Sequence, residues 1–255
     1  MSAKIISFAN QKGGVGKTTT TIEVGENLSQ TFHKKVLLID LDPQASMTSV
    51  KSNMHQIVDQ KLPTMSDVML GNQDLSNIIL NIKSNLDIAP ATLVLSDAEL
   101  NLVNATLREL ILKKALSSVI DNYDYVLIDC PPSRGVLTVN ALSASDYVVI
   151  PVQSEYQALL GMQLLKNTIK NVQSQINADL KVFGYVITMT SHTNHSNEVT
   201  ESIKQDEYPT IEEIPRTIDV ADAAVANMST YEYNKNSKAG LEYLHLTKKI
   251  MKLGE

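Results

Sequence analysis

Five short runs of consecutive apolar residues constrain the fold of this chain more than any other feature of its sequence. Such runs, bounded by polar or turn residues, are typical of strands that are covered on both faces in a parallel sheet. Longer segments with helical apolar spacing separate them, so we expect an α/β fold: a doubly wound, mostly parallel sheet with helices on both faces. The expected strands are residues 5–9, 36–40, 125–129, 146–151 and 182–188, and the expected helices are residues 18–32, 97–122, 158–176 and 240–253.

The segment 51–85 is more polar and less periodic than the rest, and it contains Pro63 and Gly71. We interpret it as short helices and loops inserted into the domain rather than as a linker. No repeat, low-complexity tract or sustained charge run divides the sequence. A chain of 255 residues that is 43% hydrophobic can bury one substantial core, and we expect a single domain over residues 1–255.

Composition excludes several classes of protein. No apolar run reaches the roughly 18 residues that a membrane span needs. The run at 5–9 is too short for a secretory signal, so a cytoplasmic location is expected. The single cysteine, Cys130, excludes a disulfide framework and a metal site built on several thiolates of one chain. A net charge of -6 excludes a generally basic nucleic-acid-binding surface but not a local basic patch.

A glycine-rich loop joins the first expected strand to the first expected helix. Its glycines let backbone N–H groups converge on phosphate oxygens, and the following helix directs its N-terminal dipole at the anion. In this pattern Lys17 places a cation on the β- and γ-phosphates, and the Thr18 hydroxyl is positioned to ligate Mg²⁺. The predicted phosphate-binding residues are Lys12, Gly13, Gly14, Val15, Gly16, Lys17, Thr18 and Thr19.

The loop departs from the standard P-loop pattern at two positions. Gln11 stands where that pattern has its first glycine, and a second lysine, Lys12, begins the loop. The resulting sequence, K-G-G-x-G-K-[ST], resembles that of the deviant Walker A ATPases, a class of P-loop NTPases. The resemblance implies a nucleotide-sandwich dimer in which Lys12 reaches the phosphates held by the second subunit, much as an arginine finger supplied in trans does.

Three aspartates follow expected strands at their carboxyl ends, where doubly wound sheets bind ligands. Asp129 is the expected Walker B residue, which holds Mg²⁺ through water, and Asp40 is expected to support Thr18 and the metal. Asp42 resembles the residue that orients the attacking water in deviant Walker A ATPases. The predicted metal-site residues are therefore Thr18, Asp40 and Asp129, and the predicted catalytic residues are Lys12, Lys17 and Asp42.

Longer stretches of the sequence resemble the ParA family of DNA-partition ATPases over residues 4–250. The resemblance lies in residues 9–19, 40–44 and 129–133, with further similarity at 151–156, 214–216 and 237–240. The P-loop begins at Lys12, which leaves no room for the N-terminal helix-turn-helix domain of the larger members, so the sequence resembles the short, Soj-like class. Relatives contact adenine through late loops, and the corresponding positions here are Met189, Thr190 and Pro215.

The resemblance implies an ATPase that hydrolyses ATP to ADP and phosphate slowly until a partner stimulates it. ATP and Mg²⁺ are the implied cofactors. ATP binding closes the homodimer, which then binds double-stranded DNA without sequence preference, and a centromere-binding, ParB-type protein stimulates hydrolysis and release. The implied function is partition of plasmid or chromosomal DNA, with the ATP-bound protein associated with the nucleoid and with no membrane partner.

The expected DNA-binding face departs from the family pattern. Asp219 and Met228 stand where many relatives carry basic residues, and residues 198–255 contain 7 Lys+Arg against 11 Asp+Glu. Each lost cation is expected to weaken binding to DNA phosphates and to reduce its salt dependence. The candidate DNA contacts are Lys204, Arg216, Lys235 and Lys238, with Lys248, Lys249 and Lys252 as further candidates.

Two alternatives that share the P-loop stay open: a MinD-like ATPase that cycles on a membrane, and another ATP-switched positioning protein whose cargo is a protein. The first requires a basic amphipathic helix, whereas we interpret Leu246, Ile250 and Leu253 as a stripe that docks into the core. A nitrogenase-type reductase needs two cluster cysteines per subunit and is excluded because Cys130 stands alone.

Overall fold

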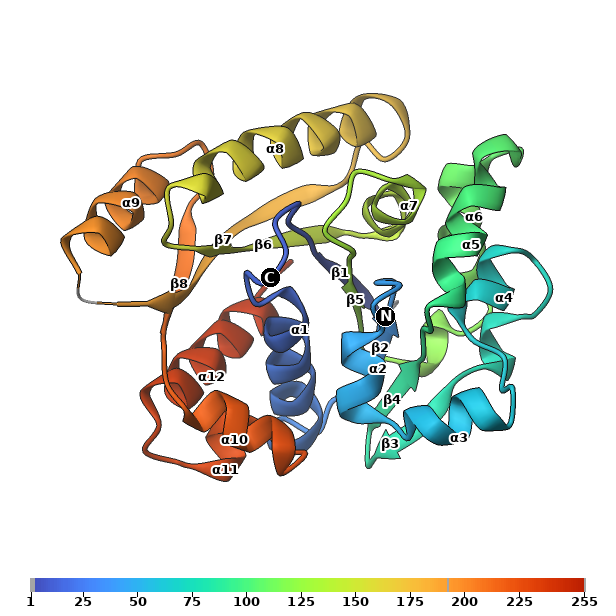
Figure 1. Ribbon diagram of the computed structural model, residues 1–255, viewed down its shortest axis with the longest axis horizontal. Coiled ribbons are helices and arrows are strands. Elements are labelled where there is room, and N and C mark those ends of the chain that lie inside the picture. Colours follow the sequence, from blue (N-terminus) through green and yellow to red (C-terminus); the bar gives the residue numbers. More distant parts are fainter. Residues whose placement is uncertain (1–2, 192, 255) are drawn as a thin grey trace.

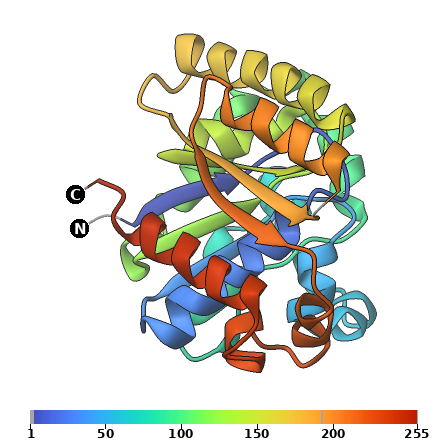
Figure 2. The same cartoon turned by 90° about the vertical axis from the view of Figure 1, so that its left-hand side faces the viewer.

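The computed structural model describes residues 3–191 and 193–254. An eight-stranded sheet runs through the molecule in the order β3-β4-β2-β5-β1-β6-β7-β8, with helices packed on both faces (Figures 1 and 2). Strands β3 and β4 pair antiparallel and the other neighbours pair parallel, which confirms the predicted α/β fold with a mostly parallel sheet. The strands are β1 (Lys4–Phe8), β2 (Val36–Asp40), β3 (Leu80–Lys83), β4 (Leu86–Ala89), β5 (Tyr125–Asp129), β6 (Tyr147–Gln153), β7 (Lys181–Thr190) and β8 (Thr210–Pro215).

The helices follow the strands in the alternation that a parallel sheet requires. They are α1 (Lys17–Glu26), α2 (Ser46–Lys51), α3 (Met54–Asp59), α4 (Met65–Met69), α5 (Val94–Asn101), α6 (Ile111–Leu116), α7 (Val136–Ala144), α8 (Gln157–Gln175), α9 (Asn194–Lys204), α10 (Asp219–Val225), α11 (Thr230–Tyr233) and α12 (Lys238–Met251). A π-helical turn, η1 (Asn27–Thr31), continues α1, and short 3₁₀ turns are η2 (Leu75–Asn77), η3 (Leu102–Asn104), η4 (Arg108–Leu110) and η5 (Ile120–Asn122).

The five predicted strands are confirmed, but one predicted helix is wrong. The segment 97–122 forms α5 and α6 with three 3₁₀ turns around them instead of one continuous helix. The physical cause lies at Leu107, whose φ of 52° is left-handed and interrupts the helical path. The sequence also did not reveal β3, β4 and β8. These strands lie toward the two ends of the sheet, and β3 and β8 mix apolar with polar residues.

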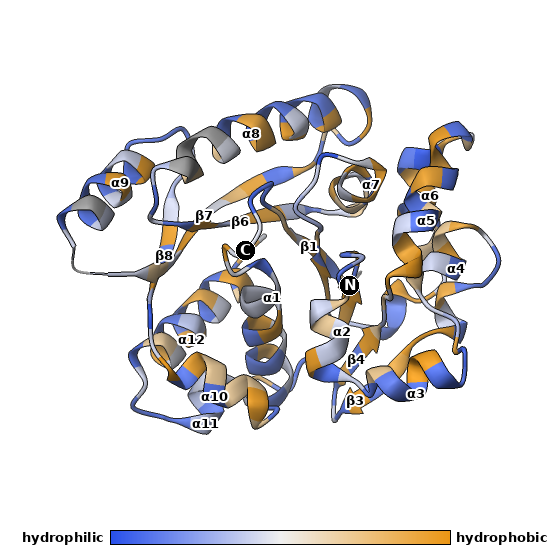
Figure 3. Cartoon of the chain, in the orientation of Figure 1, coloured by the Kyte–Doolittle hydropathy of each residue, from blue (hydrophilic) through white to orange (hydrophobic). Residues whose placement is uncertain are grey.

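Apolar side chains fill both sides of the sheet. Alternate residues of the central strands face opposite layers: Leu37 packs in one buried cluster and Leu38 in the other. Figure 3 shows the apolar character of strands such as β6 and β7. On α12 the predicted core-docking stripe is confirmed, because Leu246, Ile250 and Leu253 are buried in the cluster that also holds α1 residues. Among the described residues, no helix is both long and apolar enough to cross a membrane.

The register of the three central strands sets the position of the site. Phe8 at the end of β1 is paired with Asp129 at the end of β5, and Asp129 is in turn paired with Asp40 at the end of β2. The strands run parallel, so their carboxyl ends form one edge, and the chain segments that leave this edge lie next to one another. The loop before α1 and two of the predicted aspartates are thereby brought together.

Gly184 tests how tightly the outer part of the sheet is packed. It has a φ of 141°, and a Cβ atom added to it would lie 2.2 Å from the backbone oxygen of Pro209. We expect Gly184→Ala to lower the free energy of unfolding by about 2 kcal/mol or more, because the backbone of Pro209 would have to move. Gly71→Ala is the control, since Gly71 also has positive φ but no atom within 4 Å of an added Cβ. Equal losses in urea denaturation would refute the close-packing explanation.

Candidate nucleotide-binding site

A cavity of about 640 Å³ lies at the carboxyl edge of the sheet. One end is formed by the loop between β1 and α1, and the other by residues at the carboxyl ends of β7 and β8 together with α10. Apolar side chains predominate away from the loop. The loop end contains Gly13, Gly14, Gly16, Lys17, Thr18 and Thr19, and the far end contains Met189, Ile214, Pro215, Val220, Ala224 and Met228.

The loop has the backbone conformation that an anion cradle needs. Gly14 and Gly16 have φ values of 75° and 83°, which other residues adopt only with strain. The Thr188 hydroxyl of β7 donates a hydrogen bond to the backbone carbonyl of Val15 at 2.8 Å. An added Cβ on Gly16 would contact the Thr188 side chain at 3.4 Å. Strand β7 therefore fixes the loop from behind, while the N-terminus of α1 faces the cavity.

Lys17 and Thr18 occupy the first turn of α1. Lys17 is buried, and its ammonium group donates to the backbone carbonyl of Lys12 at 3.3 Å, so the side chain lies back across the loop. Burial lowers the pKa of Lys17, and the negative charges of Asp129 and Asp42 oppose that effect. A desolvated ammonium in this position is suited to pair with phosphate oxygens.

The two carboxylate oxygens of Asp129 have different surroundings. Thr18 donates its hydroxyl proton to Oδ2 of Asp129 at 2.6 Å. The other oxygen, Oδ1, is buried and has no hydrogen-bond partner among the described residues. Burial, and then the nearby charge of Asp40, raise the pKa of Asp129 well above its usual value. A hydroxyl and an under-coordinated carboxylate side by side are the hard oxygen donors that Mg²⁺ binds, directly or through its waters, so these residues fit the ion.

Asp40 organises the loop after β2. Its Oδ2 accepts hydrogen bonds from the backbone N–H and the hydroxyl of Thr48, at 2.9 and 2.7 Å, and its Oδ1 accepts from the N–H of Asp42 at 3.1 Å. Burial raises the pKa of Asp40 to about 6. Both oxygens are therefore engaged by protein donors, which fits the supporting role expected for Asp40 better than direct metal ligation.

Asp42 lines the cavity together with Gln44. Its Oδ1 accepts a hydrogen bond from the backbone N–H of Gln44 at 2.9 Å. The side chain is thus oriented by its own turn, close enough to Lys17 for its negative charge to raise the pKa of that lysine.

Lys12 takes a different direction from Lys17. Its ammonium group pairs with a carboxylate oxygen of Glu155 at 2.5 Å, and the two side chains are 23% and 49% exposed. Lys12 is not among the described residues that line the cavity, although its neighbours Gly13 and Gly14 are. The second lysine of the loop therefore stands at the surface, outside the cavity of its own chain.

The three predicted adenine contacts do not all line the same cavity. Met189 and Pro215 line the far end of the cavity, whereas Thr190 lines a smaller cavity of about 160 Å³ beside Lys204. Met189 has a φ of 53°, and its sulfur lies 3.8 Å from Nη2 of Arg216.

The candidate DNA contacts have different surroundings. Lys204 pairs with Glu201 and Glu213, at 3.1 and 2.9 Å. Lys235 stacks its ammonium group 4.0 Å from the ring centre of Tyr231. Arg216, Lys235 and Lys238 have no carboxylate partner within the described part of the chain.

Comparison with known proteins identifies the family. Residues 3–182 match a family model described as an AAA domain. The sporulation initiation inhibitor protein Soj of Bacillus subtilis is 43% identical over 253 residues, which are 97% of this chain and 98% of that protein. The chromosome partitioning protein ParA of Myxococcus xanthus is 36% identical, over 98% of this chain and 88% of that protein. The chain belongs to the ParA/Soj-like family of P-loop ATPases.

Two solved structures similar to this ParA/Soj-like chain contain nucleotide analogues. A putative plasmid partition protein from Borrelia burgdorferi bound to AMPPNP has a TM-score of 0.81 and 28% identity, over 98% of this chain and 99% of that chain. A structure from Mycobacterium smegmatis named cobyrinic acid a,c-diamide synthase, with bound ATP analogue and magnesium, has a TM-score of 0.83 and 34% identity, over 98% and 94%. Nucleotide and Mg²⁺ binding are therefore properties of the family.

Sequence reasoning missed Thr188, Glu155 and Glu23 of this ParA/Soj-like chain. Nothing in the local sequence marks Thr188 as the support of the loop, because the contact joins residues far apart in the chain. Glu155 lies within the similar segment 151–156, so the resemblance had marked its neighbourhood. Glu23 lines the cavity and accepts hydrogen bonds from the backbone N–H and hydroxyl of Thr230. It appeared in the sequence only as one polar position of a helix.

Glu23 generates a prediction about pH. Burial raises its pKa from 4.5 to about 7, although Thr230 and Lys51 oppose the shift. The unfolded chain therefore releases this proton first, and the contribution of Glu23 to the free energy of unfolding falls as the pH rises from 4.5 to about 7. We expect Glu23→Gln to remove this pH dependence. Between pH 4.5 and 8, the free energy of unfolding of the variant should therefore rise relative to that of wild type by up to about 3 kcal/mol. Parallel pH profiles in urea denaturation would contradict the assignment.

Proposed function

We propose that this chain is a DNA-partition ATPase whose ATP-bound form is a nucleotide-sandwich dimer. In the proposed cycle the dimer binds double-stranded DNA without sequence preference, and a centromere-binding, ParB-type partner stimulates hydrolysis and releases it. The named relatives Soj and ParA support partition as the general function. The finer steps rest on the residues of this chain.

The direction of Lys12 is the observation that carries the proposal. Lys17 already supplies the cation inside the loop, whereas Lys12 points outward to Glu155 and leaves the cavity of its own chain. A second chain that faces the loop would meet this ammonium group first. A cation supplied in trans to a phosphoryl group is worth roughly 10³–10⁵ in rate where it has been measured, so this placement makes hydrolysis depend on dimerisation.

The proposal assigns each remaining step of hydrolysis to a residue of this chain. The loop N–H groups and Lys17 hold the phosphates, and Thr18 with Asp129 would hold Mg²⁺, which neutralises charge on the phosphate oxygens. Asp42, fixed by the N–H of Gln44, orients the attacking water. Hydrolysis stays slow as long as Lys12 remains paired with Glu155 of its own chain, and closure of the dimer requires this pair to break.

The two alternatives are separated by different observations. The apolar stripe of α12 is buried, so a MinD-like membrane helix would have to leave the core to bind lipid. A positioning protein with protein cargo shares the same ATP switch and is separated from DNA partition by the DNA measurement below.

Substitution of Lys12 is expected to affect dimerisation, and substitution of Lys17 is expected to affect nucleotide binding. We expect Lys12→Ala to bind AMPPNP-Mg²⁺ with nearly wild-type affinity but to remain monomeric, because it lacks the cation for the opposite subunit. Lys17→Ala is expected to lose nucleotide binding, because the phosphates lose the buried ammonium group. Titration calorimetry measures nucleotide affinity, and light scattering measures whether the protein is monomeric or dimeric. A normal AMPPNP-dependent dimer of Lys12→Ala would refute the role across the interface.

DNA binding is tested by fluorescence anisotropy of a non-specific duplex, titrated in ATP-Mg²⁺ and in ADP-Mg²⁺. We expect binding in ATP-Mg²⁺ but not in ADP-Mg²⁺. If Arg216, Lys235 and Lys238 of both protomers contact phosphates, the logarithm of the binding constant should fall with the logarithm of the salt concentration with a slope of about -5. Lys17→Ala serves as the control that cannot switch. An intact ATP dimer that does not bind the duplex at low salt would favour protein cargo instead.

A further inference from the structure

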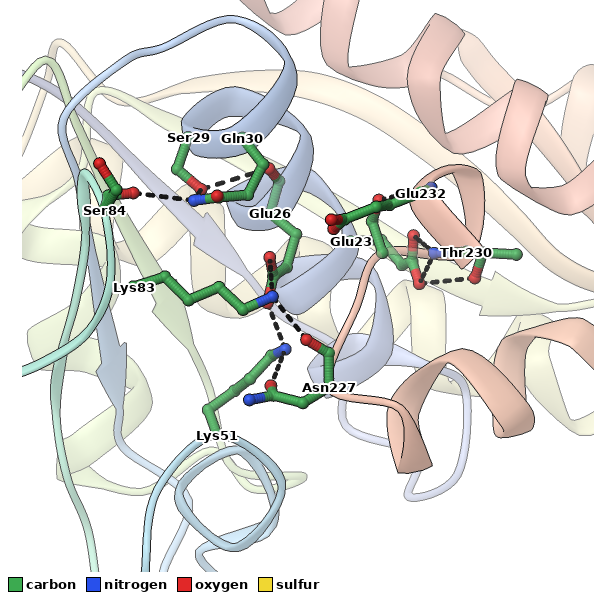
Figure 4. Close-up of polar contacts among 11 residues, drawn as sticks. Glu23, Glu26, Ser29, Gln30, Lys51, Lys83, Ser84, Asn227, Thr230 and Glu232 are labelled. Carbon is green, nitrogen blue, oxygen red and sulfur yellow. Dashed lines mark hydrogen bonds and ion pairs between the residues drawn. The ribbon is translucent and has the colours of Figure 1, made fainter. Parts of the chain in front are cut away.

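The end of α1 opposite the P-loop carries a polar cluster that is built around a buried carboxylate and reaches the surface at Asn227. Glu26 is fully buried, and its two carboxylate oxygens pair with the ammonium groups of Lys51, at the end of α2, and Lys83, in β3. Asn227 accepts a hydrogen bond from Lys51 at its side-chain oxygen (2.8 Å) and one from Lys83 at its backbone oxygen (2.5 Å). Figure 4 shows these four residues, which we call the α1 cluster, converging from separate segments.

The α1 cluster adds polar contacts to a helix that has limited apolar anchorage. Asn227 follows α10, which forms part of the cavity wall. Within α10 the side chain of Ala223 is buried, that of Val220 is partly buried against the apolar cluster that contains α12, and that of Val225 is 91% exposed. This burial gives the helix limited apolar stabilisation. The hydrogen bonds from two ammonium groups to Asn227 therefore contribute to holding α10 in position.

The α1 cluster also lies where the two walls of the cavity meet. Val50 of α2 and Ala224 of α10 line both the nucleotide cavity and a neighbouring cavity of about 500 Å³. Lys51 directly follows Val50, and Asn227 lies three residues after Ala224, beyond the end of α10. The cluster thus joins α2 to α10 through Glu26 of α1, on the side of the cavity away from the phosphates.

We propose that Glu26, Lys51, Lys83 and Asn227 are positioning residues for the nucleoside half of bound ATP. They hold α10 against α2 and so fix the apolar wall that the base and sugar contact. This inference rests on the proposed binding of ATP at the P-loop. The phosphates are bound at the opposite end of α1. Loosening the α1 cluster therefore weakens the contribution of the nucleoside to the affinity for ATP and leaves the contribution of the triphosphate intact.

Asn227→Gly is the variant that tests this role with the least disturbance. Asn227 has a φ of 54°, a conformation that glycine adopts freely, so the substitution removes the acceptor for Lys51 without backbone strain. Lys51→Met would instead leave Glu26 buried beside a single cation and risks unfolding. Asn85→Gly is the matched control: it makes the same change at a φ of 60°, in the turn between β3 and β4.

Titration calorimetry compares AMPPNP-Mg²⁺ with tripolyphosphate-Mg²⁺ on each protein. We expect Asn227→Gly to raise the Kd of AMPPNP about 10-fold, as for the loss of one hydrogen bond to a charged group, and to leave tripolyphosphate binding unchanged. Asn85→Gly should behave as wild type. Equal weakening of both ligands, or unchanged AMPPNP binding, would overturn the inference. Wild-type protein that fails to bind AMPPNP would refute the proposed function instead.

Hydrogen exchange provides a second readout that needs no ligand. We expect the amides of residues 219–228 to exchange faster in Asn227→Gly than in wild type, because α10 opens more often. The amides of the loop 12–19 should exchange at the wild-type rate. Unchanged exchange in 219–228 would overturn the inference even if tripolyphosphate binds too weakly to titrate.

Discussion

The structure depends on burying several charges at one edge of the sheet. Parallel pairing of β1, β5 and β2 places Asp129 and Asp40 side by side, with Lys17 and Asp42 nearby. Burial raises the pKa of Asp40 and of Asp129 and lowers that of Lys17, so each charged form is disfavoured in this place. The protein engages Asp40 fully with Thr48 and Asp42, but it leaves one oxygen of Asp129 without a partner. The residues of this site fit a cation and a polyanion, and binding of both would stabilise the folded state.

Helix α1 connects this edge of the sheet to several other elements. Its first turn forms the phosphate end of the cavity, Glu23 contacts the segment that begins α11, and Glu26 pairs with lysines of α2 and β3. Polar contacts inside an apolar layer are directional, and an unpaired buried charge is costly, so they specify one relative position of these elements. Under the proposed binding of ATP, the helix that faces the phosphates would therefore also position the opposite wall of the cavity.

Much of this could be read from the sequence, because the signals were local. Continuous apolar runs such as 36–40 and 125–129 predicted the central strands, and the spacing of glycines and Lys17 predicted the loop. The short outer strands carry no such run, and the break at Leu107 depends on a backbone conformation that residue type does not reveal. The same limit applies to the site. Thr188, Thr230 and Asn227 act through contacts with residues distant in the chain, and no local pattern distinguishes them from ordinary surface polar residues.

Charge explains how an acidic chain can act on DNA under the proposed function. Of the four candidate DNA contacts, Lys204 is paired with two carboxylates, which leaves Arg216, Lys235 and Lys238 available to phosphate. Non-specific affinity grows exponentially with the number of neutralised phosphates. A monomer with about three such cations binds DNA weakly at physiological salt, whereas a dimer that presents them twice gains roughly the square of that affinity. Under the proposed function, the sparse basic surface favours a sharp difference in DNA affinity between the two states, since the monomer alone would bind DNA too weakly to stay bound and the dimer would not.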